Sequence, residues 1–446
     1  MGVSAFYRST DNGASWTGGI LPGTVGRSSG GDPSLDYGPS RCQDGQFRFS
    51  CGTVIYYANL EDPVDPDLHL SEGMGVARSF DDGATWQTPV QVTSVSKSNF
   101  DDHEWIAVDN KQPSSPFFGR VYVFWAVFCA SCAGNGNVKL FVAHSSDEGA
   151  TWSAPVQVSQ GGTNNSGQGI RETGQMAVSS NGTVEAFWSE DEDSTHTATL
   201  QVTAVSNDGG ASFSGPLTIA SVTDYPLTGT PFDVVDLFNR VPGMSARVDC
   251  FPHPGAAQSG GAVYVVWCDF TGGHGVVKAA VSLDGANWQQ LGTIADLTGR
   301  NAFFPAVSVD PAGTVNLTFD ALTAPPADNP FQTGVQVYDN YFAQSVNQGA
   351  TFTPPLRVSS MSSNPDSSSY NNLKEQFIGD YIGIVSGPGQ AFVVWTDSRN
   401  AAACSVVDTY RNQVYAGSKT AVAPNPDSAC DTSFGNTDTY EATISY

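Results

Sequence analysis

The residues best suited to chemistry in this chain are carboxylates that lie close together or directly before apolar segments. Asp101, Asp102 and Glu104 share the stretch DDHEW, Glu172 lies in GIRETG, and Asp249 lies in ARVDCF. Two carboxyl groups about 5–10 Å apart can act as a general acid and as a base or nucleophile, the arrangement with which many enzymes cleave glycosidic bonds. These residues therefore predict acid–base chemistry, provided that the fold brings them to one place.

A repeated turn is the element that must position these carboxylates. The pattern Ser-x-Asp-x-Gly-x-x-Trp/Phe, which we call the Ser-Asp turn, recurs six times, with a shortened fifth copy and Asn in place of Asp in the sixth: residues 9–16, 79–86, 145–152, 206–213, 282–288 and 345–352. Asp and Ser side chains bind backbone N–H groups within a turn, and Gly adopts positive φ. Each copy lies between two short alternating segments, which predicts a hairpin turn with a purely structural role.

A second repeated element lies between the turns, namely a strand, a glycine turn and a strand that ends in an aromatic residue. QMAVSSNGTVEAFW is an example. Four strands per unit and six units predict an all-β, six-bladed β-propeller with four-stranded antiparallel blades, as a single domain over residues 1–446. The hairpin of residues 1–22 is expected to complete the last blade and close the ring. Seven blades are the alternative, if the C-terminal segment adds further strands.

Charge restricts the possible partners. The chain has 446 residues, only 19 of them basic, and a formal net charge of −25. Such a surface repels nucleic-acid phosphates and anionic membranes, and no apolar run is long enough for a transmembrane helix. The acidic loop of residues 61–73 suits a structural Ca²⁺ ion without matching the EF-hand pattern, and we expect no required cofactor and no catalytic metal.

Eight cysteines suggest an oxidising environment. Their even number favours disulfides and an extracellular, secreted protein, and their placement predicts the pairs Cys42–Cys51, Cys250–Cys268 and Cys404–Cys430. Cys129 and Cys132, in CASC, are either a tight bridge or a redox pair. The first residues lack the basic and apolar segments of a signal peptide, so a mature or trimmed form is expected.

The Ser-Asp turns resemble the Asp-box, or BNR, repeats of the sialidase superfamily, and this resemblance extends over essentially the whole chain. The stretches DDHEWIAVD, GRVYVFW and GDYIGIVSGPGQAFVVWTDSRN look most like secreted bacterial exo-α-sialidase-like proteins. The resemblance implies a propeller and, for an active member, three arginines that clamp the sugar carboxylate. It also implies a tyrosine nucleophile activated by a glutamate, and an aspartate as acid and base.

Residues just before the innermost strand of each blade can face the central funnel. This position selects the candidate site residues, and the resemblance implies the role of each. It also selects Asp32 and Asn301, to which no role is given. The resemblance implies that Tyr381, or Tyr370 in SSSYNN, is the nucleophile, that Glu172 activates it, and that Asp101 or Asp102 is the acid. The expected substrate-binding residues are Arg171, Arg247, Arg300, Asp249 and Asp380. The Arg-Ile-Pro motif of the family is absent, and Arg27 and Arg41 are the nearest substitutes.

Three functions follow from these patterns. The first is a secreted, sialidase-like, glycan-active protein that hydrolyses terminal sialic acid or a related acidic sugar from glycoconjugates. The second is a non-catalytic propeller that binds a glycan or a protein. The third is a carboxylate-based glycoside hydrolase or polysaccharide lyase. A glycan or glycoconjugate is the expected partner, and the sequence leaves the oligomeric state open.

Overall fold

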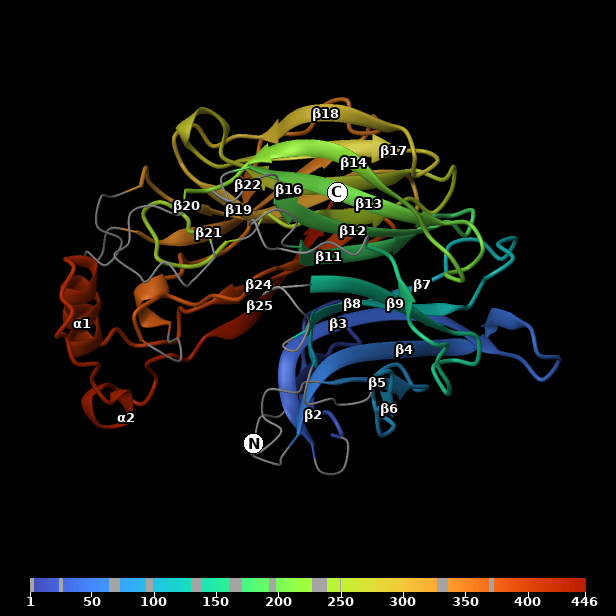
Figure 1. Cartoon of the computed structure of the whole chain (residues 1–446), viewed down its shortest axis with the longest axis horizontal. Helices are drawn as coiled ribbons and strands as arrows, with labels where there is room; N and C mark the ends of the chain where they lie inside the picture. Colours follow the sequence, from blue (N-terminus) through green and yellow to red (C-terminus); the bar gives the residue numbers. More distant parts are fainter. Residues whose placement is uncertain are drawn as a thin grey trace.

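The computed structural model describes residues 4–23, 27–63, 73–93, 99–129, 138–159, 171–191, 198–226, 239–248, 250–326, 336–368 and 373–446. Its antiparallel sheets form a six-bladed β-propeller, as the repeats predicted, and not a seven-bladed ring (Figure 1). Five sheets contain four described strands each, and the sixth contains three. The two helices lie outside the ring of sheets, at the left of Figure 1.

The strands follow one another in chain order from the innermost strand of each blade outwards. Blade 1 comprises β3 (Arg27–Arg41), β4 (Phe47–Pro63), β5 (Gly73–Ser79) and β6 (Val90–Gln91). Blade 2 comprises β7 (Asn99–Val108), β8 (Val121–Cys129), β9 (Val138–Ser145) and β10 (Val156–Gln157). Blade 3 comprises β11 (Arg171–Val178), β12 (Val184–Asp191), β13 (Ala198–Ser206) and β14 (Ser214–Thr223).

The second half of the ring repeats this order. Blade 4 comprises β15 (His253–Ala256), β16 (Val263–Asp269), β17 (Val276–Ser282) and β18 (Trp288–Ala295). Blade 5 comprises β19 (Ala302–Val309), β20 (Val315–Leu322), β21 (Tyr338–Ser345) and β22 (Leu356–Arg357). Blade 6 comprises β23 (Gly383–Gly387), β24 (Gln390–Asp397) and β25 (Asp438–Ser445), with α1 (Ser405–Tyr415) and α2 (Pro426–Ala429) between the last two strands.

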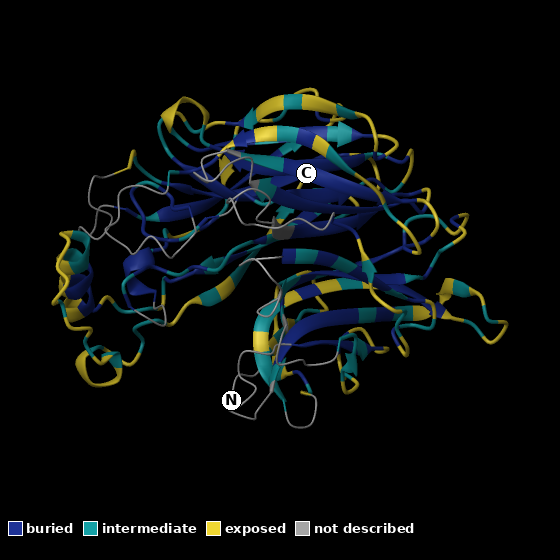
Figure 2. Ribbon diagram, viewed as in Figure 1, coloured by how far each residue is buried: buried dark blue, intermediate teal, exposed yellow. Residues whose placement is uncertain are grey.

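The six innermost strands surround the propeller axis. One cavity of about 220 Å³ is lined by residues of β3, β7, β11, β15, β19 and β23, that is, by one strand from every blade. Apolar side chains of the blades pack between neighbouring sheets, and Trp125, Trp188 and Trp267 are almost completely buried there. Figure 2 shows this burial along the blade strands, with exposed residues on outer strands such as β18 and on α1.

The Ser-Asp turns are hairpin turns between the outer strands, as predicted, and each is closed by its own side chains. In the third copy, Asp147 accepts hydrogen bonds from the backbone N–H and the hydroxyl of Thr151 at 2.9 and 2.6 Å. Ser145 donates to Asp147 at 2.7 Å and accepts from the N–H of Gly149 at 2.8 Å. Arg78 of blade 1 donates to the carbonyl of Glu148 at 3.0 Å, so the turn is also attached to the preceding blade.

Replacing Asp147 by alanine is expected to lower the free energy of unfolding by about 1–2 kcal/mol, because the turn loses its side-chain acceptor. Asp147→Asn is the matched control. In the sixth copy Asn347 already accepts from the N–H of Thr351 at 2.9 Å and donates to its hydroxyl at 2.9 Å. The asparagine variant should therefore retain most of the stability. Equal losses for both variants in urea unfolding would contradict this account of the turn.

The N-terminal hairpin contacts both the first blade and the last strand of the chain. The N-terminal hairpin, β1 (Ala5–Arg8) and β2 (Thr17–Ile20), forms a two-stranded sheet of its own, and β25 is the strand that pairs with β24. The first Ser-Asp turn contacts β25, because the hydroxyl of Thr443 donates to the carbonyl of Asn12 at 3.3 Å. On its other side, Arg8 donates to the carbonyl of Asp82 at 2.6 Å. The hairpin therefore bridges the C-terminal strand and the first blade.

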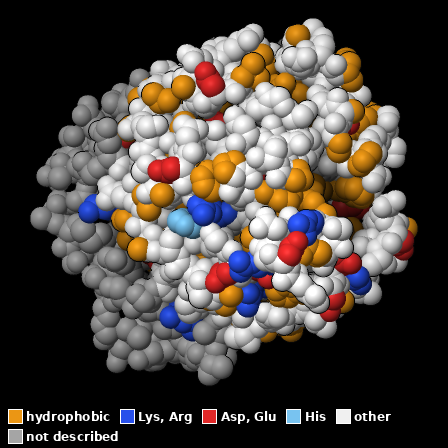
Figure 3. Space-filling model, turned by 90° about the vertical axis from the view of Figure 1, so that its right-hand side faces the viewer, with side chains coloured by type: hydrophobic (Ala, Val, Ile, Leu, Met, Phe, Trp, Pro, Cys, Tyr) orange, Lys and Arg blue, Asp and Glu red, His pale blue; other side chains and the backbone are white. Residues whose placement is uncertain are grey.

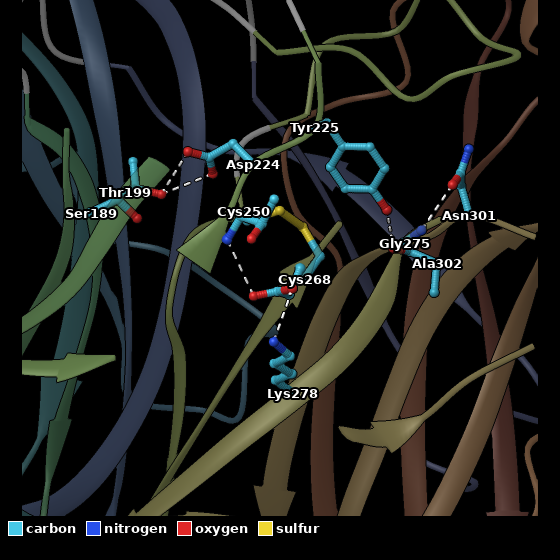
Figure 4. Close-up of a disulfide and its surroundings, with 12 residues drawn as sticks. Ser189, Thr199, Asp224, Tyr225, Cys250, Cys268, Gly275, Lys278, Asn301 and Ala302 are labelled. Carbon is cyan, nitrogen blue, oxygen red and sulfur yellow. Dashed lines mark hydrogen bonds and ion pairs between the residues drawn. A yellow bond between two sulfur atoms is a disulfide. The ribbon is translucent and has the colours of Figure 1, made fainter. Parts of the chain in front are cut away.

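Three predicted disulfides are confirmed, namely Cys42–Cys51, Cys250–Cys268 and Cys404–Cys430. Cys132 lies outside the described residues, so the CASC pair stays a prediction. The Cys250–Cys268 bridge joins the segment before β15 to β16 (Figure 4). The carbonyl of Cys250 accepts from the side chain of Gln201 in blade 3 at 2.8 Å. The segment before β15 is therefore held against β16 and β13, three residues after Arg247 of the pocket described below.

The surface carries charges of both signs. Figure 3, the face at the right of Figure 1, shows acidic and basic side chains interspersed with hydrophobic ones. Among the described residues, no helix is both long and apolar enough to cross a bilayer. Within the same residues, no group of three or more His, Cys, Asp and Glu side chains is arranged to hold a metal ion. Residues 64–72 of the acidic loop lie outside the described part, so the structural Ca²⁺ ion stays a prediction.

Candidate functional site

A pocket of about 1120 Å³ opens where the inner strands of blades 1 and 2 meet the segments before β15 and β23. It brings together four of the predicted site residues, Asp102, Arg247, Asp380 and Tyr381, and it also contains Asp32. Residues 423–426 of the excursion between β24 and β25 form another part of its lining. The pocket therefore draws on both halves of the ring and on a segment outside it.

Bulges at the start of the inner strands turn the site side chains into this pocket. The register of β3 against β4 shifts between Gly31 and Ser34, and Asp32 has φ 48°. The register of β7 against β8 shifts between Asp102 and Trp105, and His103 has φ 50°. A bulge places extra residues opposite a single partner residue and re-aims their side chains. The same local irregularity thus presents an acidic residue from each of two neighbouring blades.

Asp32 and Asp102 form a hydrogen-bonded carboxyl pair. Burial first, and then the charge of Asp32 and the hydrogen bond with it, raise the pKa of Asp102 to about 7. The backbone N–H of His103 donates to Asp102 at 2.9 Å and, like the charge of Arg247, acts in the opposite direction on the pKa. Two carboxylates this close cannot both ionise easily. The pair therefore retains a proton near neutral pH, as a general acid requires.

Arg247 and Asp380 form a two-pronged ion pair at the side of the pocket. Nε and Nη2 of Arg247 donate to the two carboxylate oxygens of Asp380 at 2.6 and 2.5 Å. The guanidinium also lies over the ring of Phe377, 5.1 Å from its centroid. Planar stacking and a forked hydrogen-bond geometry fix the orientation of an arginine. Arg247 is therefore a rigid cationic group within reach of a ligand.

Tyr381 lies among acidic groups and aromatic rings. Burial raises its pKa well above the usual value, and the charges of Asp32, Glu104 and Asp380 act in the same direction. Its ring centroid is 5.4 Å from that of His103 and 6.3 Å from that of Trp105. Glu104 is only 1 % exposed. A neutral phenol next to a buried glutamate is an arrangement in which the glutamate can take the phenol proton during an attack by the oxygen.

The other predicted site residues lie elsewhere or outside the described part. Asp101 is buried away from the pocket lining, and burial raises its pKa to about 6, opposed by a hydrogen bond with Thr93. Neighbouring side chains of a strand point to opposite faces, which separates Asp101 from Asp102. Arg300 is not brought to the pocket either, because it donates to the hydroxyl of Tyr341 at 3.1 Å and stacks on that ring in blade 5. Arg300 therefore does not line this pocket, and its substrate-binding role stays a prediction.

Three predicted residues cannot be placed by their side chains. The backbone of Arg171 and Glu172 begins β11, but their side chains lie outside the described part of the chain, as does Asp249. Their predicted roles therefore stay predictions. His103 and Phe377 were missed, because the sequence holds no signal for a contact made across the pocket. Glu104 was predicted as a funnel-facing carboxylate of DDHEW, but the activation of the tyrosine was assigned to Glu172, whereas it is the charge of Glu104 that acts on Tyr381.

Comparisons with known proteins give fold-level similarity. No family model and no curated protein sequence matches this chain. A Hadza microbial sialidase aligns with a TM-score of 0.47 at 16% identity, covering 82% of this chain and 62% of that one. An α-L-arabinanase of Penicillium chrysogenum, complexed with arabinobiose, aligns with a TM-score of 0.40 at 18% identity, covering 65% of this chain and 76% of that one. A polysaccharide lyase, an ulvan lyase bound to -[GlcA(1-4)Rha3S]-, aligns with a TM-score of 0.44 at 11% identity, covering 82% of this chain and 81% of that one.

The chain thus spans less than two thirds of the length of that sialidase. Similarity at this level assigns no family, and it leaves the chemistry of the pocket to the pocket's own residues. Those residues are a proton-holding carboxyl pair, a tyrosine beside a buried glutamate, and a guanidinium held by an aspartate, all on a β-propeller.

Proposed function

We propose that the pocket hydrolyses a terminal glycosidic bond, with Tyr381 as the nucleophile and Asp102 as the acid. The observation that carries this proposal is the presence of a proton-holding carboxyl pair and a tyrosine with a glutamate behind it in one cavity. A glycosidase needs one group that gives a proton to the leaving oxygen and another that attacks the anomeric carbon. Asp102 and Tyr381 have the protonation states suited to these two tasks.

The reaction has two steps in this proposal. In the first, the Tyr381 oxygen attacks the anomeric carbon and its proton passes to Glu104, while Asp102 protonates the leaving oxygen as the glycosidic bond breaks. In the second, Asp102 removes a proton from water, which attacks the same carbon and displaces the Tyr381 oxygen. Glu104 then returns the proton to that oxygen. Each group ends in its starting state, as a catalyst must.

An acidic terminal sugar, such as sialic acid, is the first candidate substrate. A neutral phenol can approach an anomeric carbon that bears a carboxylate without the repulsion that an anionic nucleophile meets. Arg247 supplies a cation within the pocket, and an arginine fork matches a sugar carboxylate. The secreted location and the glycan partner expected from the sequence agree with such a substrate, and the disulfides are typical of extracellular proteins.

A neutral sugar is the second candidate, and one specific observation favours it. Asp380 already engages two nitrogens of Arg247, the only basic side chain of the described pocket lining. Even with one proton on the Asp32–Asp102 pair, the lining carries two carboxylates against one guanidinium. This excess of carboxylates disfavours an anionic sugar and accommodates a neutral one.

Fluorogenic 4-methylumbelliferyl glycosides test the proposal and separate the candidates. Turnover of the α-sialoside supports the acidic sugar, and turnover of the α-L-arabinofuranoside with none of the sialoside supports the neutral one. Asp102→Asn should abolish either activity, while Asp101→Asn, the neighbouring carboxylate outside the pocket, should leave it unchanged. Folded protein that turns over no glycoside of the panel, yet binds glycans on an array, would establish the non-catalytic alternative instead.

The pH dependence of turnover is a further expected result. Asp102 must carry its proton to act as the acid, and its pKa is raised to about 7. The rate constant kcat/KM should therefore be highest below pH 7 and fall about tenfold per pH unit above it. The measurement is a pH–rate profile of the wild type, with the folded state monitored by circular dichroism. A profile that stays flat between pH 6 and 9 would remove Asp102 from the acid role.

A further inference from the structure

The excursion between β24 and β25, residues 398–437, lies outside the propeller and contains α1 and α2 (Figure 1). Its two ends are joined by the Cys404–Cys430 disulfide. Leu373 packs against Cys404, Val407 and Tyr410 in a small apolar cluster and also lines the pocket. The excursion therefore has a core of its own that reaches the edge of the candidate site.

Arg411 of α1 joins this excursion to the segment before β23. Its side chain is completely buried. It donates to the backbone carbonyls of Leu373, Asp366, Ser368 and Glu375 at 3.1, 2.8, 2.9 and 2.8 Å. A buried charge is costly unless its donors are satisfied, and here four carbonyls of residues 366–375 accept from the guanidinium. That segment leads directly into the residues that carry Asp380 and Tyr381.

The same segment is attached on its other side to the segment before β15, which carries Arg247. The carboxylate of Glu375 pairs with the buried Arg240 at 2.9 Å, and the amide oxygen of Gln376 accepts from the N–H of Ser245 at 2.7 Å. The bidentate pair of Arg247 and Asp380 continues this attachment into the pocket. The position of Tyr381 is thus set from two directions, one of which is α1.

The excursion also contributes to the pocket lining. Ala423, Pro424, Asn425 and Pro426 face the same cavity as Asp102 and Tyr381. Asn425 caps α2, because its side chain accepts from the N–H of Asp427 at 3.0 Å. This part of the lining is therefore locally ordered.

We propose that Arg411 is a positioning residue of the site, and that the excursion holds Tyr381 and Asp380 in place from outside the ring. The consequence for catalysis rests on the proposed function, whereas the positioning itself does not. Arg411→Lys retains the charge but cannot make the forked contacts to four carbonyls. Arg411→Met removes the charge with a similar chain length. Arg357→Lys, an exposed arginine of blade 5 paired with Asp339, is the matched control.

The first readout is turnover of the active glycoside. Displacement of a reacting group by about 1 Å can cost ~100-fold in rate. We expect kcat of Arg411→Lys to fall by about 10–100-fold, with KM changed by less than about threefold, and Arg357→Lys to behave as the wild type. Unchanged kcat in a folded Arg411→Met variant would overturn the inference while leaving the hydrolase proposal intact.

The second readout needs no activity. Protein labelled with 3-fluorotyrosine gives ¹⁹F resonances, and Tyr381 is assigned from the resonance lost in Tyr381→Phe. In the Arg411 variants this resonance should shift, and the pKa of its phenol should fall towards that of free fluorotyrosine, whereas Arg357→Lys should leave both unchanged. A wild type without turnover that shows these shifts would reject the hydrolase and retain the positioning role.

A variant without the Cys404–Cys430 disulfide tests the same proposal if the Arg411 variants do not fold. If neither Arg411 variant folds, Cys404→Ala/Cys430→Ala opens the excursion without altering Arg411. The Tyr381 resonance should then broaden and shift as well. An unperturbed resonance in that double variant would show that the excursion does not position Tyr381, and it would overturn the proposal.

Discussion

Tyr381→Phe is expected to lower kcat/KM by about 1000-fold or more without a measurable loss of thermal stability. The variant keeps the ring that packs against His103 and Trp105 and removes only the oxygen that attacks the sugar. That oxygen lies near the charges of Asp32, Glu104 and Asp380, which hold its pKa above the usual value after burial has raised it. The phenol is neutral in the folded protein, so its acidic neighbours are not stabilised by any charge on it. We therefore expect removal of the hydroxyl to cost little stability.

Tyr225→Phe is the matched control for this prediction. The Tyr225 hydroxyl is also buried and donates to the carbonyl of Ala302 at 2.5 Å, outside the pocket (Figure 4). This control should lose about 1 kcal/mol of stability and retain full activity. Retention of kcat/KM within about threefold in Tyr381→Phe would instead favour the carboxylate-based chemistry. Glu104→Gln would then be the variant that loses turnover.

Glu185→Gln is expected to raise the free energy of unfolding by about 3 kcal/mol at pH 7 and by almost nothing at pH 4. Glu185 lies on β12, is 1 % exposed, and its Oε2 has no hydrogen-bond partner among the described residues. Burial, with a smaller contribution from the charge of Asp284, raises its pKa from 4.5 to about 8. The variant replaces an acid that resists ionisation in the folded state by a neutral amide of the same shape.

The sign of this effect follows from the two pKa values. Below pH 4.5 both the folded and the unfolded states carry the proton, so Glu185 contributes nothing to the pH dependence. Between pH 4.5 and 8 the unfolded state loses the proton and the folded state retains it, so the wild type is destabilised by about 1.4 kcal/mol per pH unit. Urea unfolding of the wild type and of Glu185→Gln at pH 4 and pH 7 measures the difference between their free energies of unfolding. A difference between the two proteins that is equal at both pH values would indicate altered packing and contradict the proton account.

Glu185 occupies a position that is a tyrosine in the equivalent place of other blades. In four of the six Ser-Asp turns, the glycine lies on the second strand of the preceding blade. Under Gly149, Gly210 and Gly349 that strand presents Tyr56, Tyr122 and Tyr264, and under Gly285 it presents Glu185. A tyrosine fills this place with an apolar ring, whereas a glutamate brings a carboxyl group into it. Local sequence revealed the turn, and only the packing of neighbouring blades revealed what lies beneath it.

Local interactions are what the amino-acid sequence determined by itself. A Ser-Asp turn forms from side chains and N–H groups within four residues of one another, so its letters predict its shape wherever they occur. Six such turns with alternating strands between them imply a ring of antiparallel blades, because only stacking of like units buries their apolar faces. Residues just before the inner strands then lie at one end of that ring, which is why Asp102, Arg247, Asp380 and Tyr381 were predicted together.

The tertiary structure decided the rest of the site, because its contacts join residues far apart in the chain. Arg247 and Asp380 are 133 residues apart, and no local signal pairs them. Bulges in β3 and β7 decide that Asp32 and Asp102 meet while Asp101 points away. The sequence does not mark where such a bulge lies, because one extra residue in a strand leaves no recognisable pattern of residue types. The buried fork of Arg411 depends on where a helix outside the repeats comes to rest. Periodicity specifies the ring, and packing between distant segments specifies which groups its pocket holds.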